Sequence, residues 1–298
     1  MTIGEKIKEL RQAKFMTQAD LAGKQITRNM LSAIENGSAQ PSLGTLLYLS
    51  ERLGVPAGFL LAEGGDETLY RKMNALPNIK RAYEAKDFSS CRRFCLDAAK
   101  EPDDELCLLL SQCDLELAKE AFDMGRFRAA SRLFDEALEY ADRGNYPIDR
   151  ASSEAAVYFA YFERVSPGLY SEVLDPDYSP AFVWQGDFAT YVRALAALER
   201  EEVDFVRACL SSFDEGFFGT HLSVLLEMKA GNFADAKEAL LTLLTGGELK
   251  YPFMRFEVLG ALEVACRETG DYKGAYEYAT EKVQLAEQLL SDLDTQKM

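Results

Sequence analysis

TQADLAGKQITRNMLSAIEN, residues 17–36, carries two helix starts ten residues apart. Thr17 and Asp20 have the spacing of a capping box, in which each side chain bonds the other residue's backbone N–H. Thr27 is a second N-cap candidate, and Asn36-Gly37 suits the left-handed conformation that often ends a helix. The stretch therefore predicts a short helix, a turn and a helix over residues 28–35.

Three further helices are expected around this pair. Ile3, Ile7 and Leu10 space the apolar face of a first helix, and Pro41-Ser42 starts a fourth that is rich in leucine. Gly54-Val55-Pro56 breaks that helix, and Phe59-Leu60-Leu61 closes the core. In the helix over 28–35 we expect a buried stripe made of Met30, Leu31 and Ile34.

The order of these motifs resembles the phage-repressor, or Xre-type, helix-turn-helix domain. The resemblance spans about residues 3–61 and rests on Met16 to Ala22, Ile34-Glu35-Asn36-Gly37, Pro41-Ser42-Leu43 and Leu53-Gly54-Val55. The turn between the second and third helices is one residue shorter than usual. Arg11 and Glu35 occupy the positions of an ion pair that, in this family, connects the first helix to the recognition helix.

The resemblance implies that the helix over 28–35 enters the major groove of DNA, with its first residues nearest the base edges. Arg28 can donate two hydrogen bonds to guanine, and Asn29 can pair with adenine. The residues expected near the bases are Thr27, Arg28, Asn29, Ser32 and Ala33. Those expected near phosphates are Gln18, Lys24, Asn36 and Ser38.

The distribution of charged residues also separates the N-terminal segment from the rest of the chain. The net charge is −16, yet residues 1–65 hold seven basic and six acidic residues, which leaves 26 basic and 43 acidic residues for the rest. Phosphate attracts positive surface, so only the first segment suits DNA. We expect a DNA-binding domain over 1–62, a linker over 63–72 and a sensor and dimerisation domain over 73–298.

The second domain repeats one pattern. Lys86-Asp87-Phe88, Gly125-Arg126-Phe127, Gly231-Asn232-Phe233 and Gly270-Asp271-Tyr272 each precede a small residue three positions after the aromatic. A weaker copy places Phe205 before Ala208. Such spacing is typical of stacked helix pairs, in which the aromatic lies between helices and the small residue lies where they cross. The pattern resembles the tetratricopeptide repeat, so the fold class is all-α: a five-helix DNA-binding domain and an α-solenoid.

Residues 166–180 are rich in proline and are expected to interrupt the array. Elsewhere, stacked pairs create a concave groove lined by the first helix of each pair. The groove candidates, by repeat position, are Gln112, Lys119, Tyr161, Thr190, Arg193, His221, Met228, Glu257 and Arg267. For any single one of them, an ordinary solvated helix position is the alternative. Tyr158, Phe159, Tyr161 and Phe162 form an aromatic cluster that favours the core.

No enzyme chemistry is indicated. The chain has a single histidine, His221, which disfavours histidine triads and multi-histidine metal sites, and it has no GxxxxGK[ST] phosphate loop. Its six cysteines form no CxxC pair and are expected to be packed thiols, with redox sensing as a remoter alternative. We expect no cofactor and no metal.

The N-terminus has no signal-peptide core, and no apolar run approaches the roughly 20 residues of a membrane span. These features predict a cytoplasmic protein that does not contact membranes.

The combined architecture resembles the peptide-responsive quorum-sensing regulators of the Rgg and PlcR type. The resemblance implies a homodimer, a double-stranded DNA operator and a short peptide effector. Groove asparagines, which that family uses to hold the peptide backbone, are few here. Two alternatives stay open: a regulator with a protein partner or no ligand, and an adaptor or antitoxin-like scaffold whose domains both bind proteins.

Overall fold

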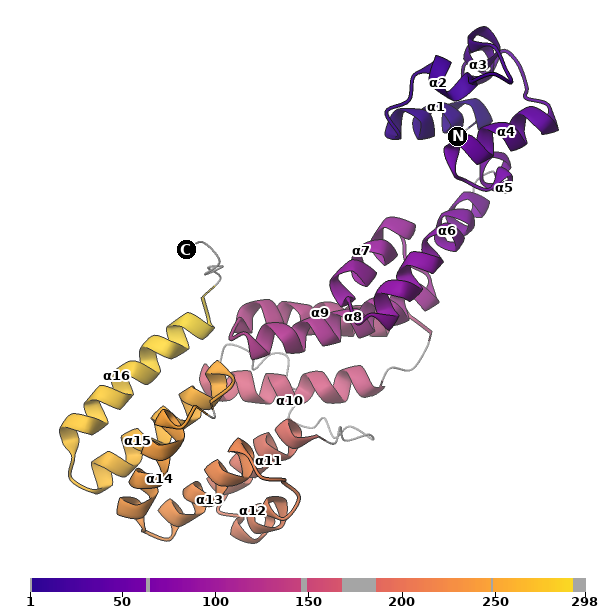
Figure 1. The fold of residues 1–298 in the computed structure, drawn as a ribbon. Helices are drawn as coiled ribbons and strands as arrows, with labels where there is room; N and C mark the ends of the chain where they lie inside the picture. Colours follow the sequence, from indigo (N-terminus) through magenta and orange to yellow (C-terminus); the bar gives the residue numbers. More distant parts are fainter. Residues whose placement is uncertain (1, 63–64, 146–148, 168–185, 248, 292–298) are drawn as a thin grey trace. The chain divides into compact units, whose positions relative to one another are not determined.

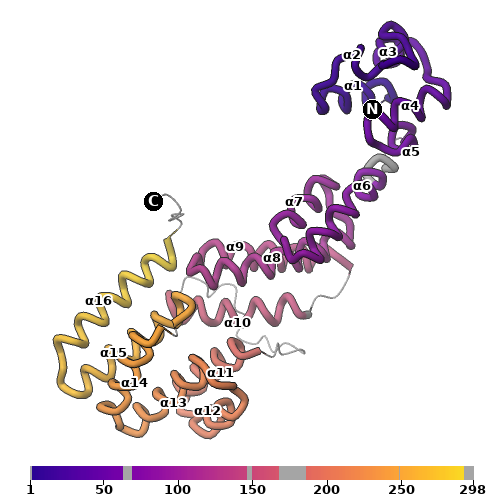
Figure 2. The backbone as a smooth tube through the Cα atoms, viewed as in Figure 1, coloured from indigo at the N-terminus to yellow at the C-terminus, as the bar shows by residue number. Residues whose placement is uncertain are grey.

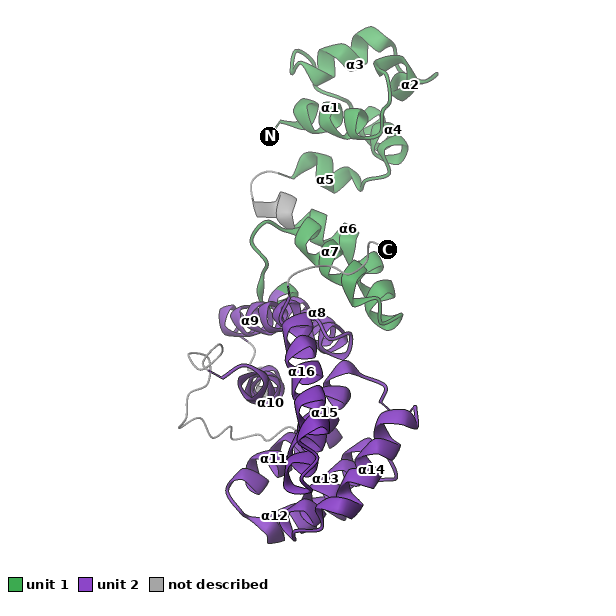
Figure 3. Cartoon of the chain, turned by 90° about the vertical axis from the view of Figure 1, so that its left-hand side faces the viewer, with its two compact units in different colours: residues 1–106 green, residues 107–298 purple. Residues whose placement is uncertain are grey.

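The computed structural model describes residues 2–62, 65–145, 149–167, 186–247 and 249–291, and within these ranges it contains sixteen α-helices and no strand (Figure 1). The prediction of an all-α fold is confirmed. The chain divides into two compact units, residues 1–106 and 107–298, shown in different colours in Figure 3.

The first unit begins with five short helices around one core. They are α1 (Ile3–Ala13), α2 (Gln18–Ala22), α3 (Arg28–Glu35), α4 (Leu43–Leu53) and α5 (Ala57–Leu61). Each contributes at least one fully buried side chain, namely Ile7, Leu21, Leu31, Leu49 and Leu60. The predicted five-helix domain is confirmed.

The buried stripe predicted for α3 is only partly correct. Leu31 and Ile34 are buried, but Met30 is 39% exposed. Thr27 caps the backbone N–H of Met30, so Met30 lies in the first turn of α3, beyond the edge of the core. Two residues rather than three therefore anchor α3.

Gly4 permits a close approach between α1 and α3. A Cβ atom at Gly4 would lie 2.1 Å from the backbone oxygen of Ile34 and 3.0 Å from that of Glu35. Any side chain at this position would therefore collide with the end of α3.

The first unit ends with a helix hairpin, α6 (Gly65–Glu84) and α7 (Phe88–Ala98), which pack against each other. The segment expected as a linker, 63–72, thus includes the first residues of α6.

The second unit consists mainly of antiparallel helix pairs, which Figure 2 traces from magenta to yellow. The pairs are α8 (Asp104–Asp123) with α9 (Phe127–Arg143), α11 (Asp187–Glu199) with α12 (Val203–Leu210), α13 (Phe217–Lys229) with α14 (Phe233–Thr245), and α15 (Pro252–Glu268) with α16 (Tyr272–Leu289). Between the first two pairs lies α10 (Asp149–Val165), which packs on α9 and α11. Most of the proline-rich stretch 166–180 lies outside the described residues.

Five hairpins share one turn. In each, a residue with positive φ stands two positions before the next helix: Lys86, Gly125, Glu201, Gly231 and Gly270. The backbone N–H that follows reaches back to a carbonyl five residues earlier, as Arg126 does to Ala121 and Asp271 to Cys266. This is the Schellman motif, which satisfies carbonyls at a helix end. The repeat seen in the sequence is therefore a repeated helix-ending turn.

That turn corrects the register of one predicted copy. Glu201 has a φ of 62°, so the equivalent of Phe127 is Val203 and not Phe205. Phe205 is 39% exposed, whereas Val206, three residues after Val203, is fully buried.

The expectation that the aromatic lies between helices holds fully only for Phe127. Phe127 is fully buried, but Tyr272 is 72% exposed because no further pair covers α16 in the described chain. In all five hairpins, the residue three positions after the first residue of the second helix is buried. These residues are Cys91, Ala130, Val206, Ala236 and Ala275.

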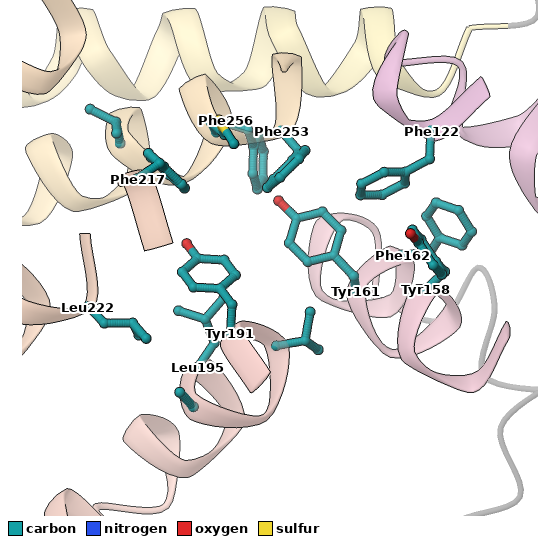
Figure 4. Close-up of a cluster of buried hydrophobic side chains, with 14 of the residues drawn as sticks. Phe122, Tyr158, Tyr161, Phe162, Tyr191, Leu195, Phe217, Leu222, Phe253 and Phe256 are labelled. Atoms are coloured by element: carbon teal, nitrogen blue, oxygen red, sulfur yellow. The ribbon is translucent and has the colours of Figure 1, made fainter. Parts of the chain in front are cut away.

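An aromatic cluster fills the centre of the second unit (Figure 4). Phe122 and Phe127, on either side of the α8–α9 turn, stack with their ring centroids 4.8 Å apart. Tyr158 and Tyr161 of α10 meet Phe122 edge-on. The interpretation of Tyr158, Phe159, Tyr161 and Phe162 as core is confirmed, since each is at most 6% exposed.

All six cysteines are buried thiols. Among the described helices, none has the length and apolar character needed to cross a membrane.

Candidate nucleic-acid interface and effector groove

The start of α2 is held by a capping box. The Thr17 hydroxyl accepts a hydrogen bond from the Asp20 backbone N–H at 3.1 Å, and the Asp20 carboxylate accepts one from the Thr17 N–H at 2.8 Å. The pKa of Asp20 is lowered by a further hydrogen bond from the Thr17 hydroxyl to Asp20 Oδ2 at 2.6 Å and by the bond from the Thr17 N–H. The box fixes the point at which Gln18 enters the helix.

A buried ion pair connects α1 and α3. Arg11 donates from Nε to Glu35 Oε1 at 2.6 Å and from Nη2 to Oε2 at 3.0 Å. Burial tends to raise the pKa of Glu35, but hydrogen bonds from Arg11 and Gln18 outweigh it and lower the pKa. The pair expected between Arg11 and Glu35 is thus present and structural.

Gln18 also forms a hydrogen bond with Glu35. Its Nε2 donates to Glu35 Oε2 at 2.8 Å, which orients the side chain toward the protein. A phosphate expected at Gln18 would therefore be met chiefly by the backbone N–H groups at the start of α2.

The first residues of α3 face solvent. Thr27 accepts a hydrogen bond from the Met30 N–H at 3.1 Å, which caps the helix. Arg28 and Asn29 are exposed, and within the described chain neither side chain forms a hydrogen bond or ion pair. Ser32 and Ala33, one turn later, are half-buried. Arg28 and Asn29 are therefore free to contact an external surface.

The other predicted phosphate contacts surround α3. Lys24 and Asn36 are exposed, and Asn36 is the C-cap residue. Ser38 is exposed too, but its hydroxyl donates to the backbone oxygen of Ala33 at 3.0 Å. Ser38 thus supports the end of α3 through its own hydrogen bond.

In the second unit, a cavity of about 730 Å³ opens between α10, α13 and α15. Of the predicted groove residues, His221, Met228 and Glu257 line it. A neighbouring recess of about 320 Å³ is otherwise mostly apolar and shares five residues with the cavity, namely Arg164, Glu199, Leu225, Met228 and Val264.

Arg164 lies where the two cavities meet. It donates from Nε to Glu257 Oε1 at 3.3 Å and from Nη2 to Oε2 at 3.4 Å, and its Nη1 pairs with Glu199. Glu257 is 5% exposed, whereas the Glu199 side chain is 64% exposed. Arg164 is therefore held by one buried and one exposed carboxylate.

Tyr161 supports this arrangement from the core. Its hydroxyl donates to Glu257 Oε1 at 3.0 Å, and burial raises its pKa far above the ordinary value. Tyr161 is fully buried, so it reaches the cavity only through Glu257.

His221 is fully buried in the wall of the cavity. Its Nδ1 lies 2.9 Å from the Tyr191 hydroxyl, while Nε2 has no hydrogen-bond partner among the described residues. Burial lowers the pKa of His221 to about 4, so the ring is neutral at physiological pH.

The remaining groove candidates lie elsewhere. Lys119 pairs with Glu116 and Glu154, and the Arg193 guanidinium lies over the Phe205 ring at 5.7 Å. Arg267 is half exposed beside Glu268. Neither these three residues nor Gln112 and Thr190 line the two cavities.

Sequence reasoning missed Arg164 and Glu199. Arg164 follows Tyr161 by three residues, which places both on one face of α10. That spacing was a usable signal. Nothing in the sequence singles out Glu199 from the other carboxylates of a chain with 49 acidic residues.

A comparison with known protein families identifies the first domain. Residues 7–60 match the helix-turn-helix family. The N-terminal domain is a helix-turn-helix. The immunity repressor protein of Bacillus phage phi105 is 36% identical over 90 residues, which are 30% of this chain and 58% of the repressor. The chain thus spans little more than half the length of this curated relative.

Two solved structures align over nearly the whole chain. The apo form of the competence regulator ComR from Streptococcus vestibularis is 17% identical, covers 95% of this chain and 91% of its own, and has a TM-score of 0.22. PlcR from Bacillus thuringiensis, in complex with the peptide PapR7 and DNA, is 13% identical, with coverages of 97% and 99% and a TM-score of 0.22. At these values the likeness carries no conclusion about function.

Proposed function

We propose that the protein is a sequence-specific DNA-binding transcription regulator that works as a homodimer and binds a peptide effector. The observation that carries the DNA-binding part is the exposed, unpartnered pair Arg28 and Asn29 at the capped start of α3. The buried pair of Arg11 and Glu35 holds this helix in place, so the two side chains are displayed on a fixed support.

In this proposal Arg28 and Asn29 read base edges, with Thr27, Ser32 and Ala33 beside them. Lys24, Asn36, Ser38 and the backbone at Gln18 contact phosphates. Residues 1–62 act as the DNA-binding domain, 63–72 as a linker that includes the start of α6, and 73–298 as the sensor and dimerisation domain. The protein works in the bacterial cytoplasm, where its operator is found.

The peptide part rests on the cavity between α10, α13 and α15 and on the neighbouring recess, which is lined mainly by α11 and α13. Their volumes, about 730 and 320 Å³, match the roughly 300–1,000 Å³ of ligand pockets. A polar centre beside an apolar recess suits a peptide, which has both a polar backbone and apolar side chains.

The test is a footprint of the purified full chain on DNA upstream of its own gene and neighbouring genes, at two salt concentrations. We expect protection of two half-sites that weakens steeply with salt, because phosphate contacts release counterions. Absence of protection on all such DNA, with and without candidate peptides, would favour a protein-binding scaffold.

Substituting Arg28→Ala together with Asn29→Ala should abolish the specific footprint, since loss of a base-reading contact costs roughly 1–3 kcal/mol each. The matched control is Arg207→Ala, which removes the same charge from an exposed position on α12. Unchanged circular dichroism shows that the double variant is folded. Retention of the wild-type footprint by that folded variant would refute the assignment of α3 as the recognition helix.

A further inference from the structure

We propose that Arg164 and His221 form a subsite for the C-terminal carboxylate of a peptide whose last side chain is apolar and occupies the recess beside them. This inference rests on the proposed function and specifies which end of the effector binds, and where.

The first argument is that one of the two carboxylates bound to Arg164 can be replaced by a ligand. Its Nε and Nη2 are held by Glu257, which is buried and also bonded by Tyr161. Among the described residues, its Nη1 pairs only with Glu199, whose side chain is 64% exposed. Because Glu199 is largely solvated, its ion pair contributes little net stability, and an incoming carboxylate can take its place while Glu199 moves into water.

The second argument is that His221 has an unused hydrogen-bonding atom in the same cavity. Nε2 is buried and makes no hydrogen bond of regular geometry in the described chain, although the Glu257 backbone lies near the ring. The Tyr191 hydroxyl, at 2.9 Å, can donate to Nδ1, which places the ring proton on Nε2. A buried polar atom without a partner is unfavourable, and a ligand oxygen that accepts from Nε2 removes that cost.

The third argument is the apolar recess. Its apolar lining includes Leu195, Leu198, Phe233 and Val264, and its charged lining residues are Arg164, Glu199 and Lys229. When the C-terminal carboxylate of a peptide binds Arg164, the side chain of the last peptide residue therefore lies against the aliphatic and aromatic wall of the recess. The larger cavity is also lined by Gly260 and Ala261, which are small, and by Lys282.

The single histidine makes the test direct. Full-length protein with histidine ¹⁵N-labelled at Nε2 only, purified without a histidine tag, gives one ring-nitrogen signal and needs no residue assignment. The compounds to titrate are N-acetyl-leucyl-leucine, its C-terminal amide and decanoate. We expect the free acid to shift the Nε2 resonance and to bind about tenfold or more tightly than the amide, as for a charge-assisted hydrogen bond.

Glu199→Gln is predicted to strengthen binding of the free acid rather than weaken it. Because Glu199 competes for Arg164, its removal should tighten binding of the free acid severalfold and leave the amide unchanged. Glu199 is largely exposed, so this variant should fold. Glu268→Gln, which makes the same charge change outside both cavities, is the control. Arg164→Lys keeps a cation for Glu257 but loses the fork geometry, and should reduce the preference for acid over amide.

The outcomes separate the two proposals. Equal binding of acid and amide, or weaker acid binding in Glu199→Gln, would overturn the carboxylate subsite while leaving a peptide effector in place. Decanoate binding tighter than the dipeptide would overturn the peptide as the source of the carboxylate. Failure of every compound to shift the imidazole would overturn the subsite itself, and the DNA footprint would still test the regulator.

Discussion

His221 combines complete burial with a titratable ring. The groups that face it are Tyr191, Glu257 and Arg164, and burial dominates over their charges, lowering its pKa to about 4. A histidine in an unfolded chain titrates near pH 6.5. As the pH falls below about 6.5, the unfolded state therefore binds a proton that the folded state does not.

This difference predicts that the folded state loses stability in acid and that His221 accounts for part of the loss. The free energy of unfolding should fall by about 1.4 kcal/mol per pH unit between about pH 6.5 and pH 4. From pH 7 to pH 5, the wild type should lose about 2 kcal/mol more than His221→Gln, as measured by urea denaturation. The carboxylates titrate in both proteins and cancel in the comparison. Parallel pH profiles would show that His221 is not buried in its neutral form.

At the scale of the element, the close contact between α1 and α3 depends on Gly4. Gly4→Ala should destabilise the helix-turn-helix by about 1–3 kcal/mol, because its Cβ would lie 2.1 Å from the Ile34 oxygen. Thermal unfolding followed by circular dichroism measures the loss. Gly44→Ala is the matched control, since that glycine is exposed on α4 and its Cβ would meet only the Ser42 hydroxyl oxygen, at 4.0 Å. Equal stability of the two variants would contradict the packing described here.

The shared hairpin turn gives a second prediction for the elements. Glu201 has a φ of 62° and Gly231 a φ of 90° in equivalent turns. A non-glycine residue in this conformation costs about 1 kcal/mol, so Glu201→Gly should stabilise the second unit and Gly231→Ala should destabilise it by similar amounts. A Cβ at Gly231 would meet no atom within 4 Å, so conformation alone is tested. Melting-temperature shifts of the same sign in both variants would refute the equivalence of the turns.

For the whole molecule, charge and assembly are linked. The 43 acidic residues beyond position 65 oppose DNA binding by that part of the chain, so contact must be concentrated in the N-terminal domain. A single small domain makes few contacts, whereas two copies on a repeated operator double them.

We therefore expect the full chain to dimerise through residues 73–298. Sedimentation velocity at micromolar concentration should give about twice the mass of the 33.3 kDa chain. Added salt should not dissociate the dimer if its contacts are mainly apolar. A monomer under these conditions would exclude the dimeric regulator in its proposed form.

The sequence by itself determined the helical fold, the helix-turn-helix and the positions of four of the five repeated turns. These features are encoded by residues close together in the chain, such as Thr17 with Asp20, or Gly125 with Phe127, so local chemistry fixes them. The fifth turn was misplaced by two residues because Val203 stands where the other copies have an aromatic residue, and an aromatic residue, Phe205, follows two positions later.

Only the tertiary structure brings together the residues of the proposed effector site. Arg164 and Glu257 are 93 residues apart, and His221 stands on a third helix between them in the sequence. Periodicity shows that each helix has a buried face, but it does not show which buried polar group remains unpartnered once the helices pack. That depends on the crossing of α10, α13 and α15, which is set by side-chain packing across the whole unit.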